Sequence, residues 1–293
     1  GCEDVIYPEL PEADPVVVID AWLDNRPDTQ VIHVNQSLPY FEAEELPGIR
    51  GANVTVTDSE GRVYQFIESE VETGMYYWDP IAEGETFGEV GRDYILSVVI
   101  GGTVYQSSAT MNAVPEIDSI SYRFEEGNDF FPDSYFASFY ASDLAGPGDT
   151  YWIKAYKNGT YLNKPSEVNV AFDAGFSAGS LVDGIVFIQP IRDGINPFDT
   201  DDNDQFLSPY SAGDSVYVEI HSISNQAYLF LNELVIQTDR PGGFAELFAQ
   251  PLSNVPTNIV NTSGGKDVVG FFNVAAVSAA GRRLDPDNLP TAE

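Results

Sequence analysis

Strict alternation of apolar and polar residues over short stretches is the feature that most limits the fold of this chain. Residues 52–57 (ANVTVT) alternate, the turn-forming residues 58–61 (DSEG) follow, and a second short strand pattern occupies residues 62–67 (RVYQFI). A period of two residues around a glycine-containing turn predicts a β-hairpin. Gly101-Gly102 separates two further stretches of this kind. The chain is therefore predicted to be built mostly from β-strands.

The first part of the chain repeats this pattern at short intervals. Its predicted strands lie at residues 16–23, 30–38, 52–57, 62–67, 74–78, 93–100 and 103–107. Short strands separated by turn residues predict a β-sandwich. Residues 51–66 (GANVTVTDSEGRVYQF) and 91–102 (GRDYILSVVIGG) resemble transthyretin-like or carboxypeptidase-regulatory-like domains, which are Ig-like and generally non-catalytic. We expect such a domain at residues 14–113.

Residues 114–116 (VPE) mark the predicted junction with a second domain, residues 114–293. This domain is also expected to be a β-sandwich, with strands at residues 117–124, 135–141, 150–156, 185–191, 214–222 and 270–279. One helix is predicted at residues 225–238, since its apolar residues recur at helical spacing. Ser224 or Asn225 is expected to cap this helix. No helix is expected earlier in the chain.

The charge of the chain limits its partners. It holds 46 Asp and Glu against 13 Lys and Arg, a formal net charge of -33. Such a surface repels nucleic-acid phosphates and anionic lipid headgroups, so we expect no nucleic-acid binding and no basic membrane patch. The sequence has one cysteine and two histidines, which leaves no material for a cysteine-based metal cluster and little for a histidine-rich site.

Residues 1–13 combine a lone cysteine, Cys2, with the acidic pair Glu3-Asp4 and two prolines. Acidic, proline-spaced sequence predicts an extended tether without secondary structure. A cysteine ahead of such a tether is typical of a bacterial lipoprotein, and the acidic pair resembles the surface-export signal of Bacteroidetes lipoproteins. We therefore expect a membrane-anchoring lipid on Cys2, with an ordinary free thiol as the alternative.

An acidic segment at residues 196–204 (NPFDTDDND) is the candidate ion site. Asp199, Asp201 and Asn203 stand at alternate positions, a spacing that lets one tight loop direct several oxygens at a hard cation such as Ca²⁺. The segment lacks the glycine of an EF-hand loop, and Tyr210 occupies the position of its final glutamate. Two interpretations stay open, a Ca²⁺ site and an acidic loop in solvent; no other cofactor is expected.

Two adjacent aromatic residues, Phe130 and Phe131, lie in a predicted loop among asparagine and aspartate. Their acidic neighbours make a core position hard to explain, and aromatic side chains are common anchors at recognition surfaces. The pair therefore predicts a contact patch, with a loop tucked onto the sandwich as the alternative.

Residues 175–179 (GFSAG) match the G-x-S-x-G motif of serine hydrolases. That motif needs a following helix, whereas residues 180–184 (SLVDG) lead into another predicted strand. His221, the only downstream histidine, is predicted on the polar face of a strand beside Glu219. A loop of small residues is the preferred interpretation, and we expect no catalytic residues and no enzymatic activity.

Several segments, taken in order, carry a resemblance over nearly the whole chain. They are residues 10–41, 51–66, 115–126, 213–234, 254–261 and 270–283. Together they resemble the Bacteroidetes lipoproteins of domain of unknown function 4249. The resemblance implies an outer-membrane lipoprotein encoded beside a TonB-dependent transporter, with its lipid on Cys2 and no established catalytic activity.

These observations lead us to expect a non-catalytic cell-envelope lipoprotein that captures ligand for, or docks on, a TonB-dependent outer-membrane transporter. It is expected to be lipid-anchored in the outer membrane and exposed at the cell surface, with the periplasmic face as the alternative. A surface adhesion or structural module without a transport role is the other function left open.

Overall fold

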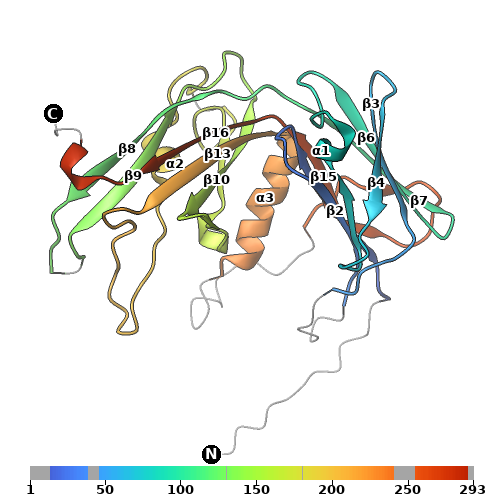
Figure 1. Ribbon diagram of the computed structural model, residues 1–293, viewed down its shortest axis with the longest axis horizontal. Coiled ribbons are helices and arrows are strands. Elements are labelled where there is room, and N and C mark those ends of the chain that lie inside the picture. Colours follow the sequence, from blue (N-terminus) through green and yellow to red (C-terminus); the bar gives the residue numbers. More distant parts are fainter. Residues whose placement is uncertain (1–13, 39–45, 130, 180, 241–254, 290–293) are drawn as a thin grey trace, which may run out of the picture.

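The computed structural model describes residues 14–38, 46–129, 131–179, 181–240 and 255–289 (Figure 1). It is mostly β, with 44% strands and 11% helix arranged as several sheets, a β-sandwich-type fold as the alternating pattern predicts. Figure 1 shows two groups of strands side by side, with the long helix α3 lying between them.

The first group contains every strand predicted before residue 113. They are β1 (Val17–Asp24), β2 (Gln30–Gln36), β3 (Asn53–Asp58), β4 (Val63–Glu68), β5 (Met75–Trp78), β6 (Asp93–Ile100) and β7 (Thr103–Thr110). Two later strands, β14 (Val260–Asn261) and β15 (Val268–Ala275), complete the path β14-β7-β6-β3-β4-β5-β2-β1-β15. A short helix, α1 (Pro80–Glu83), follows β5 and was not predicted.

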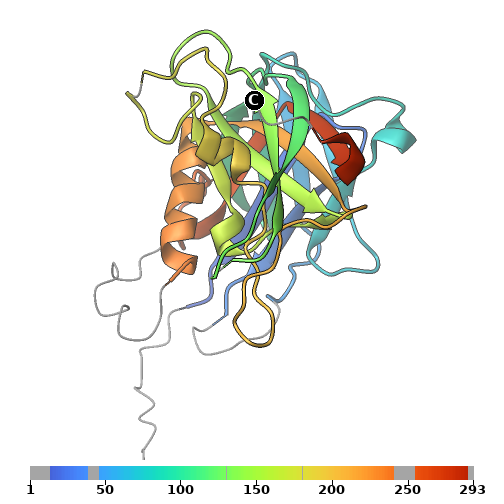
Figure 2. The same cartoon turned by 90° about the vertical axis from the view of Figure 1, so that its left-hand side faces the viewer.

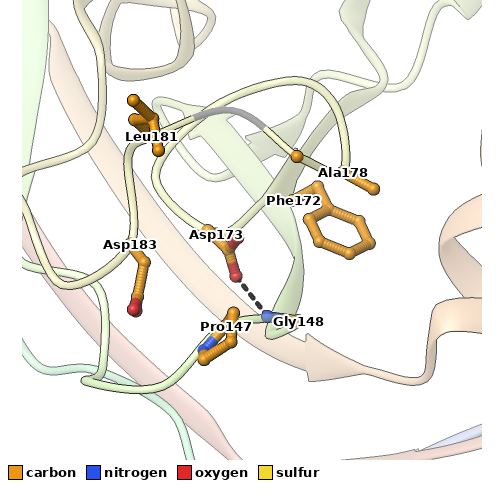
Figure 3. A pocket seen from close by; sticks show the side chains of 8 residues that line it. Pro147, Gly148, Phe172, Asp173, Ala178, Leu181 and Asp183 are labelled. Atoms are coloured by element: carbon orange, nitrogen blue, oxygen red, sulfur yellow. Dashed lines mark hydrogen bonds between the residues drawn. The ribbon is translucent and has the colours of Figure 1, made fainter.

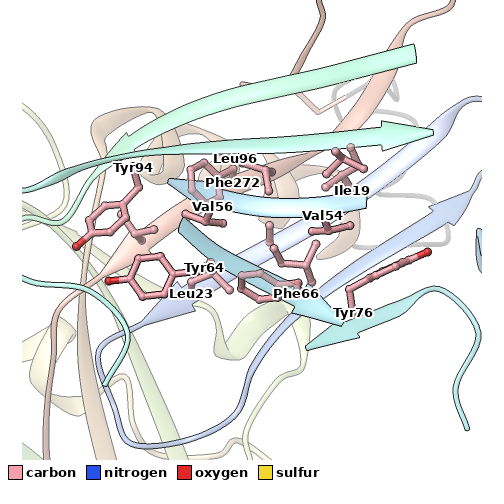
Figure 4. Close-up of a cluster of buried hydrophobic side chains, with 14 of the residues drawn as sticks. Ile19, Leu23, Val54, Val56, Tyr64, Phe66, Tyr76, Tyr94, Leu96 and Phe272 are labelled. Atoms are coloured by element: carbon pink, nitrogen blue, oxygen red, sulfur yellow. The ribbon is translucent and has the colours of Figure 1, made fainter. Parts of the chain in front are cut away.

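Alternation places one face of β1 to β7 and of β15 in a common core, part of which Figure 4 shows. Tyr76 and Trp78 point inward from β5, as their spacing predicts, and are 0% and 4% exposed. The predicted turn at Gly101-Gly102 is confirmed, since both residues have positive φ (56° and 89°) as a two-residue hairpin requires. The residue spacing therefore accounts for which side chains of β1 to β7 face the core.

The second group is formed by β8 (Ile117–Glu125) and β9 (Ser134–Ala141), which pair with each other, and by a second sheet. That sheet has the order β11-β10-β13-β16, with β12 also paired to β10. Its strands are β10 (Thr150–Lys157), β11 (Thr160–Tyr161), β12 (Asn169–Phe172), β13 (Ser215–Ile223) and β16 (Val277–Arg283). The Tyr122 hydroxyl of β8 donates to the Arg282 carbonyl (2.9 Å) and accepts from the Val216 N–H (3.1 Å), which ties the two layers together.

Helix α3 (Asn225–Thr238) has the bounds that the apolar periodicity predicts. The Ser224 hydroxyl accepts from the Ala227 N–H (3.1 Å) and caps the helix start. Ala227, Tyr228 and Leu231 are buried against a small core that also holds Phe271 of β15 and Val170 of β12. The helix thus packs between strands of both groups.

The strand predicted at residues 185–191 is wrong. Residues Gln189–Asp193 form the short helix α2, with Ile191 buried. Pro190 lies in the first turn of this helix. Backbone N–H groups there have no acceptor within the helix, so the missing N–H of proline costs no hydrogen bond. Two 3₁₀ turns, Pro165–Glu167 and Pro286–Asn288, complete the helical segments of the described residues.

The strand predicted at residues 270–279 is two strands in different sheets. β15 pairs in parallel with β1, and β16 pairs antiparallel with β13. The change of sheet falls at Ala276, whose N–H donates to the Ser222 hydroxyl (2.9 Å). Residues 260–275, which the sequence assigned to the second domain, therefore lie in the first sheet; the division into two domains stays a prediction.

Gly270 explains why β15 can lie so close to β1. Its φ is +106°, and a Cβ there would lie 1.9 Å from the Ile19 carbonyl oxygen. Only glycine adopts this backbone conformation freely and leaves the space that the neighbouring strand fills.

Candidate functional site

A hairpin at residues 196–208 projects from the second group of strands, at the lower edge of the molecule in Figures 1 and 2. Both of its ends are fixed to β9. The Asn196 side chain accepts from the Ala137 N–H (2.7 Å) and donates to the Ala137 carbonyl (2.8 Å). The Ser208 hydroxyl accepts from the Tyr135 N–H (3.0 Å). The base of the hairpin is therefore held rigidly on the sheet.

The tip of this hairpin is organised by one aspartate. The Asp201 carboxylate accepts from the backbone N–H groups of Asn203 (2.8 Å) and Gln205 (2.9 Å). The bonds from Gln205 and then Asn203 lower the pKa of the Asp201 carboxyl below its ordinary value. The Leu207 N–H donates to the Asp199 carbonyl (2.9 Å) across the stem, so the aspartates here shape a turn.

Two of the three predicted cation ligands already have partners in this hairpin. The Asp199 carboxylate forms an ion pair with Lys164, while one Asp201 oxygen accepts the two backbone bonds just described. Within the described ranges, no group of three or more Asp, Glu, His or Cys side chains is placed to hold a metal ion. Ca²⁺ binding by Asp199, Asp201 and Asn203 stays a prediction.

The loop at residues 126–133 packs beside the hairpin. The Gly127 N–H donates to the Asp133 carboxylate (2.7 Å), and the Phe131 N–H donates to the Asn128 side chain (3.2 Å). A Cβ at Gly127 would lie 2.6 Å from the Phe131 carbonyl oxygen, so the tight loop requires glycine there. Phe130 lies outside the described residues.

Three phenylalanine rings from these two segments meet at the surface. The rings of Phe131 and Phe206 stack at 4.7 Å, and the Phe198 ring lies 4.7 Å from that of Phe206. Phe198 is 70% exposed and Phe131 is 45% exposed. We call Phe131, Phe198 and Phe206 the aromatic patch. It borders a hollow of about 250 Å³, which Phe136, Leu207 and Pro209 also line.

Phe131 was predicted as a contact residue, but Phe198 and Phe206 were missed. Their positions in the sequence could have indicated them, since Phe198 and Phe206 flank the acidic residues 199–204. In the sequence, the carboxylates of that segment point to an ion site, and nothing local relates the flanking rings to Phe131. The hairpin brings its two flanking rings together and sets them against Phe131.

A second hollow, of about 550 Å³, lies beside residues 175–179 and is shown in Figure 3. Asp173 accepts from the N–H groups of Gly148 (2.6 Å) and Asp149 (3.1 Å), and Asp183 accepts from the Gly146 N–H (2.9 Å). These two carboxylates hold the loop at residues 146–149 in place. Ala178 and Gly179 line the hollow as part of a loop, which agrees with the small-residue interpretation of the G-x-S-x-G match.

A group of charged side chains lies between the two groups of strands. Arg26, after β1, contacts the Asp24 carboxylate (2.8 Å) and the Glu219 carboxylate of β13. The His221 Nε2 lies 2.8 Å from the other Glu219 oxygen. We call Asp24, Arg26, Glu219 and His221 the charged junction. Glu219 and His221 share one face of β13, as the alternation predicts, but both side chains are buried there, where Arg26 contacts Glu219.

Burial and ion pairing have opposite effects on the carboxyl pKa values of this junction. Burial, with the nearby Lys154 charge, lowers the pKa of His221 to about 4, so the imidazole is neutral at neutral pH. Burial opposes the charge on Glu219, but the hydrogen bond from His221 and the Arg26 charge outweigh it and lower the pKa of this carboxyl. His221 is thus held as a neutral partner of the buried Glu219 carboxylate.

A family model for a domain of unknown function, DUF4249, matches residues 3–280. The chain belongs to this family. The match covers both groups of strands, the aromatic patch and the charged junction. No curated protein matches the chain. The family description assigns no function, and Cys2 lies outside both the matched and the described residues. Among the described residues, no helix has the length and apolar character needed to cross a membrane.

Proposed function

We propose that this DUF4249 chain is a non-catalytic cell-envelope lipoprotein that docks on a TonB-dependent outer-membrane transporter. A lipid on Cys2 anchors it in the outer membrane, with the folded part on the cell surface. The observation that carries the docking role is the aromatic patch. The membrane anchor and the transporter rest on the lone cysteine, the acidic tether and the resemblance of the chain to Bacteroidetes lipoproteins.

The geometry of the patch supports a binding role over a packing role. Exposed aromatic rings that touch each other leave apolar surface in water, and this surface would be stabilised by burial against a partner. Two of the rings, Phe198 and Phe206, sit on a hairpin fixed at both ends by Asn196 and Ser208, so little conformational entropy is lost when a partner binds. Aromatic anchors on a rigid base are the usual centre of protein interfaces.

The state of the histidine supports a non-catalytic role. A serine nucleophile at Ser177 would need a base, and His221 is the histidine downstream of it. Its Nε2 is bonded to Glu219, and its lowered pKa makes it a poor general base at neutral pH.

The test uses the full-length protein, tagged at its C-terminus, in its native host cells. After reversible crosslinking, the wild type is expected to carry a fatty acid and to purify with a TonB-dependent transporter. Cys2→Ser should lose the fatty acid, whereas Phe198→Ser should keep it and lose the transporter. Leu181→Ser replaces a fully exposed apolar residue away from the patch and should keep both.

Two results would overturn this proposal. One is a lipid-carrying protein that crosslinks to no transporter at any expression level. The other is a Phe198→Ser variant that keeps every partner of the wild type, together with a wild-type protein that attaches cells to a surface, as an adhesion module does.

A further inference from the structure

We propose that the aromatic patch binds a basic, apolar segment of the partner protein, in which one large apolar side chain enters the hollow and flanking lysine or arginine residues meet the surrounding carboxylates. This inference rests on the proposed docking function and names the chemistry of the docked segment. The occupant is argued from the size of the hollow and from the charges around it.

The hollow has the size of an anchor site for a side chain. Its volume of about 250 Å³ lies below the range of about 300–1,000 Å³ that is usual for pockets of small-molecule ligands. Its apolar walls include the rings of Phe131, Phe198 and Phe206, which favour an apolar inserted group, and Glu125 and Glu126 also line it, which favours basic residues beside that group. Such an arrangement resembles the pockets that receive one anchoring side chain at protein interfaces.

The segments that carry the patch are strongly acidic. Residues 123–136 and 198–209 contain one basic residue, Arg123, and the acidic residues Glu125, Glu126, Asp129, Asp133, Asp199, Asp201, Asp202 and Asp204. Arg123 is already paired with Glu125 (2.8 Å) and Asp193 (3.2 Å). A partner segment with positive charges beside its apolar anchor therefore complements this surface.

The rings themselves also favour cations. The Arg123 guanidinium lies 5.0 Å from the centre of the Phe136 ring, which lines the hollow. The exposed face of Phe198 offers a second ring to a lysine or arginine of the partner, a contact worth about 0.5–1 kcal/mol at exposed sites.

The same charges disfavour two other occupants. Two copies of the chain meeting through this patch would bring the acidic hairpins of both copies together, in a protein of net charge -33. An anionic lipid surface would be repelled in the same way. A basic segment of a different protein is the occupant that the charge pattern selects.

The test is fluorescence anisotropy with the purified full-length chain and three labelled synthetic peptides. The first alternates lysine with leucine and phenylalanine, the second replaces each lysine by glutamate, and the third replaces each apolar residue by serine. The first should bind, with an affinity that falls as salt rises, and the other two should bind at least about tenfold more weakly.

Variants locate the binding. Phe198→Ser should weaken binding of the first peptide about tenfold, a change of ~1.4 kcal/mol. The double variant Asp202→Asn/Asp204→Asn should weaken it about threefold at low salt and less at high salt. Leu181→Ser, at an exposed position outside the patch, should leave it unchanged. Thermal unfolding of each variant confirms that it is folded.

Three outcomes would overturn the inference. The first is equal binding of the lysine and glutamate peptides. The second is an equal loss of binding in Leu181→Ser and Phe198→Ser. The third is binding through Phe198 either to vesicles of 3:1 phosphatidylcholine and phosphatidylglycerol or to a second copy of the chain. If the first peptide binds at Phe198 but no transporter is captured in cells, the proposed function fails and this inference stands. If a transporter is captured through Phe198 but the lysine and glutamate peptides bind equally well, this inference fails and the proposed function stands.

Discussion

The charged junction and the aromatic patch are opposite departures from the usual arrangement of a soluble protein. At the junction, Asp24, Glu219 and His221 are buried and the Arg26 side chain is 27% exposed, and each of the four has a partner within the group. At the patch, large apolar rings lie at the surface, and their contacts with each other leave much of their area in water. The charges of the junction are paired within the chain, whereas the rings of the patch keep apolar surface that a partner could bury.

This difference separates structure from binding. Buried charges are tolerated when paired, and pairs that span two layers fix how those layers meet. Arg26 and Asp24 come from the β1 end and Glu219 and His221 from β13, so the junction links the two groups of strands. The hairpin that carries Phe198 and Phe206 projects beyond the sheets (Figure 1), and Phe131 and Phe198 are 45% and 70% exposed. The junction is therefore expected to govern stability and the patch to govern partner binding.

The largest effect is expected from breaking the junction. Arg26→Met leaves the Glu219 and Asp24 carboxylates, 2% and 10% exposed, without their cation. Removing one partner of a buried ion pair typically costs about 3–5 kcal/mol. Urea unfolding should show a loss of that size in the free energy of unfolding.

Arg50→Met is the matched control for this change. Arg50 pairs with Glu68 (3.2 Å) at the surface and is 57% exposed. A surface pair contributes under about 1 kcal/mol, so the control should lose little. Equal losses in Arg26→Met and Arg50→Met would show that the junction is not a stabilising feature.

Acid should weaken the same region. The pKa of His221 is lowered from 6.5 to about 4 on folding, so the unfolded chain binds this proton first. The stability from neutral His221 is complete above about pH 6.5 and is lost as the pH falls toward 4, by up to about 3 kcal/mol. The lowered pKa values of Asp24 and Glu219 add a further loss as the pH falls below their unfolded values of 3.8 and 4.5.

A pH series of urea unfolding measures this loss. His221→Gln keeps an N–H donor for Glu219 but cannot take up a proton, so it should flatten the decline between pH 6.5 and 4. His33→Gln, which changes the half-exposed histidine on β2, should leave that decline in place. A wild-type curve that is flat over this interval would argue against a buried, neutral His221.

The smallest effect on stability is expected at the patch. Phe198→Ala removes a ring that is 70% exposed, and the free energy of unfolding should change by less than about 1 kcal/mol. Phe139→Ala removes a fully buried ring of β9 and should lose about 3–5 kcal/mol. Comparable losses in both variants would mean that Phe198 is a packing residue.

The sequence predicted those parts of the fold that local patterns determine. The alternating strands and the cap and bounds of α3 follow from periodicity and turn residues, which act over a few positions. The strand predicted at residues 185–191 was wrong because the β-branched residues there favour a strand, whereas Pro190 suits the first turn of α2. The change of sheet at Ala276 depends on bonds to distant Ser222, which no local pattern encodes.

The candidate site shows the same limit. Phe131 was found from an unusual local setting, but Phe198 and Phe206 gain meaning only when the hairpin stacks them against Phe131. Burial of Glu219 and His221 was missed because alternation reports which residues share a face, not what covers that face. Arg26, far away in the chain, supplies the covering charge.

Photo-crosslinking from single positions in native cells tests the binding role of the patch most directly. A photoreactive phenylalanine analogue at position 198 is compared with the same analogue at exposed positions 181 and 71, outside the patch. The account predicts a crosslink from position 198 to one TonB-dependent transporter, mapped to a segment with an apolar residue between basic ones, and none from the other two. The same products from all three positions, or none from 198, would contradict it.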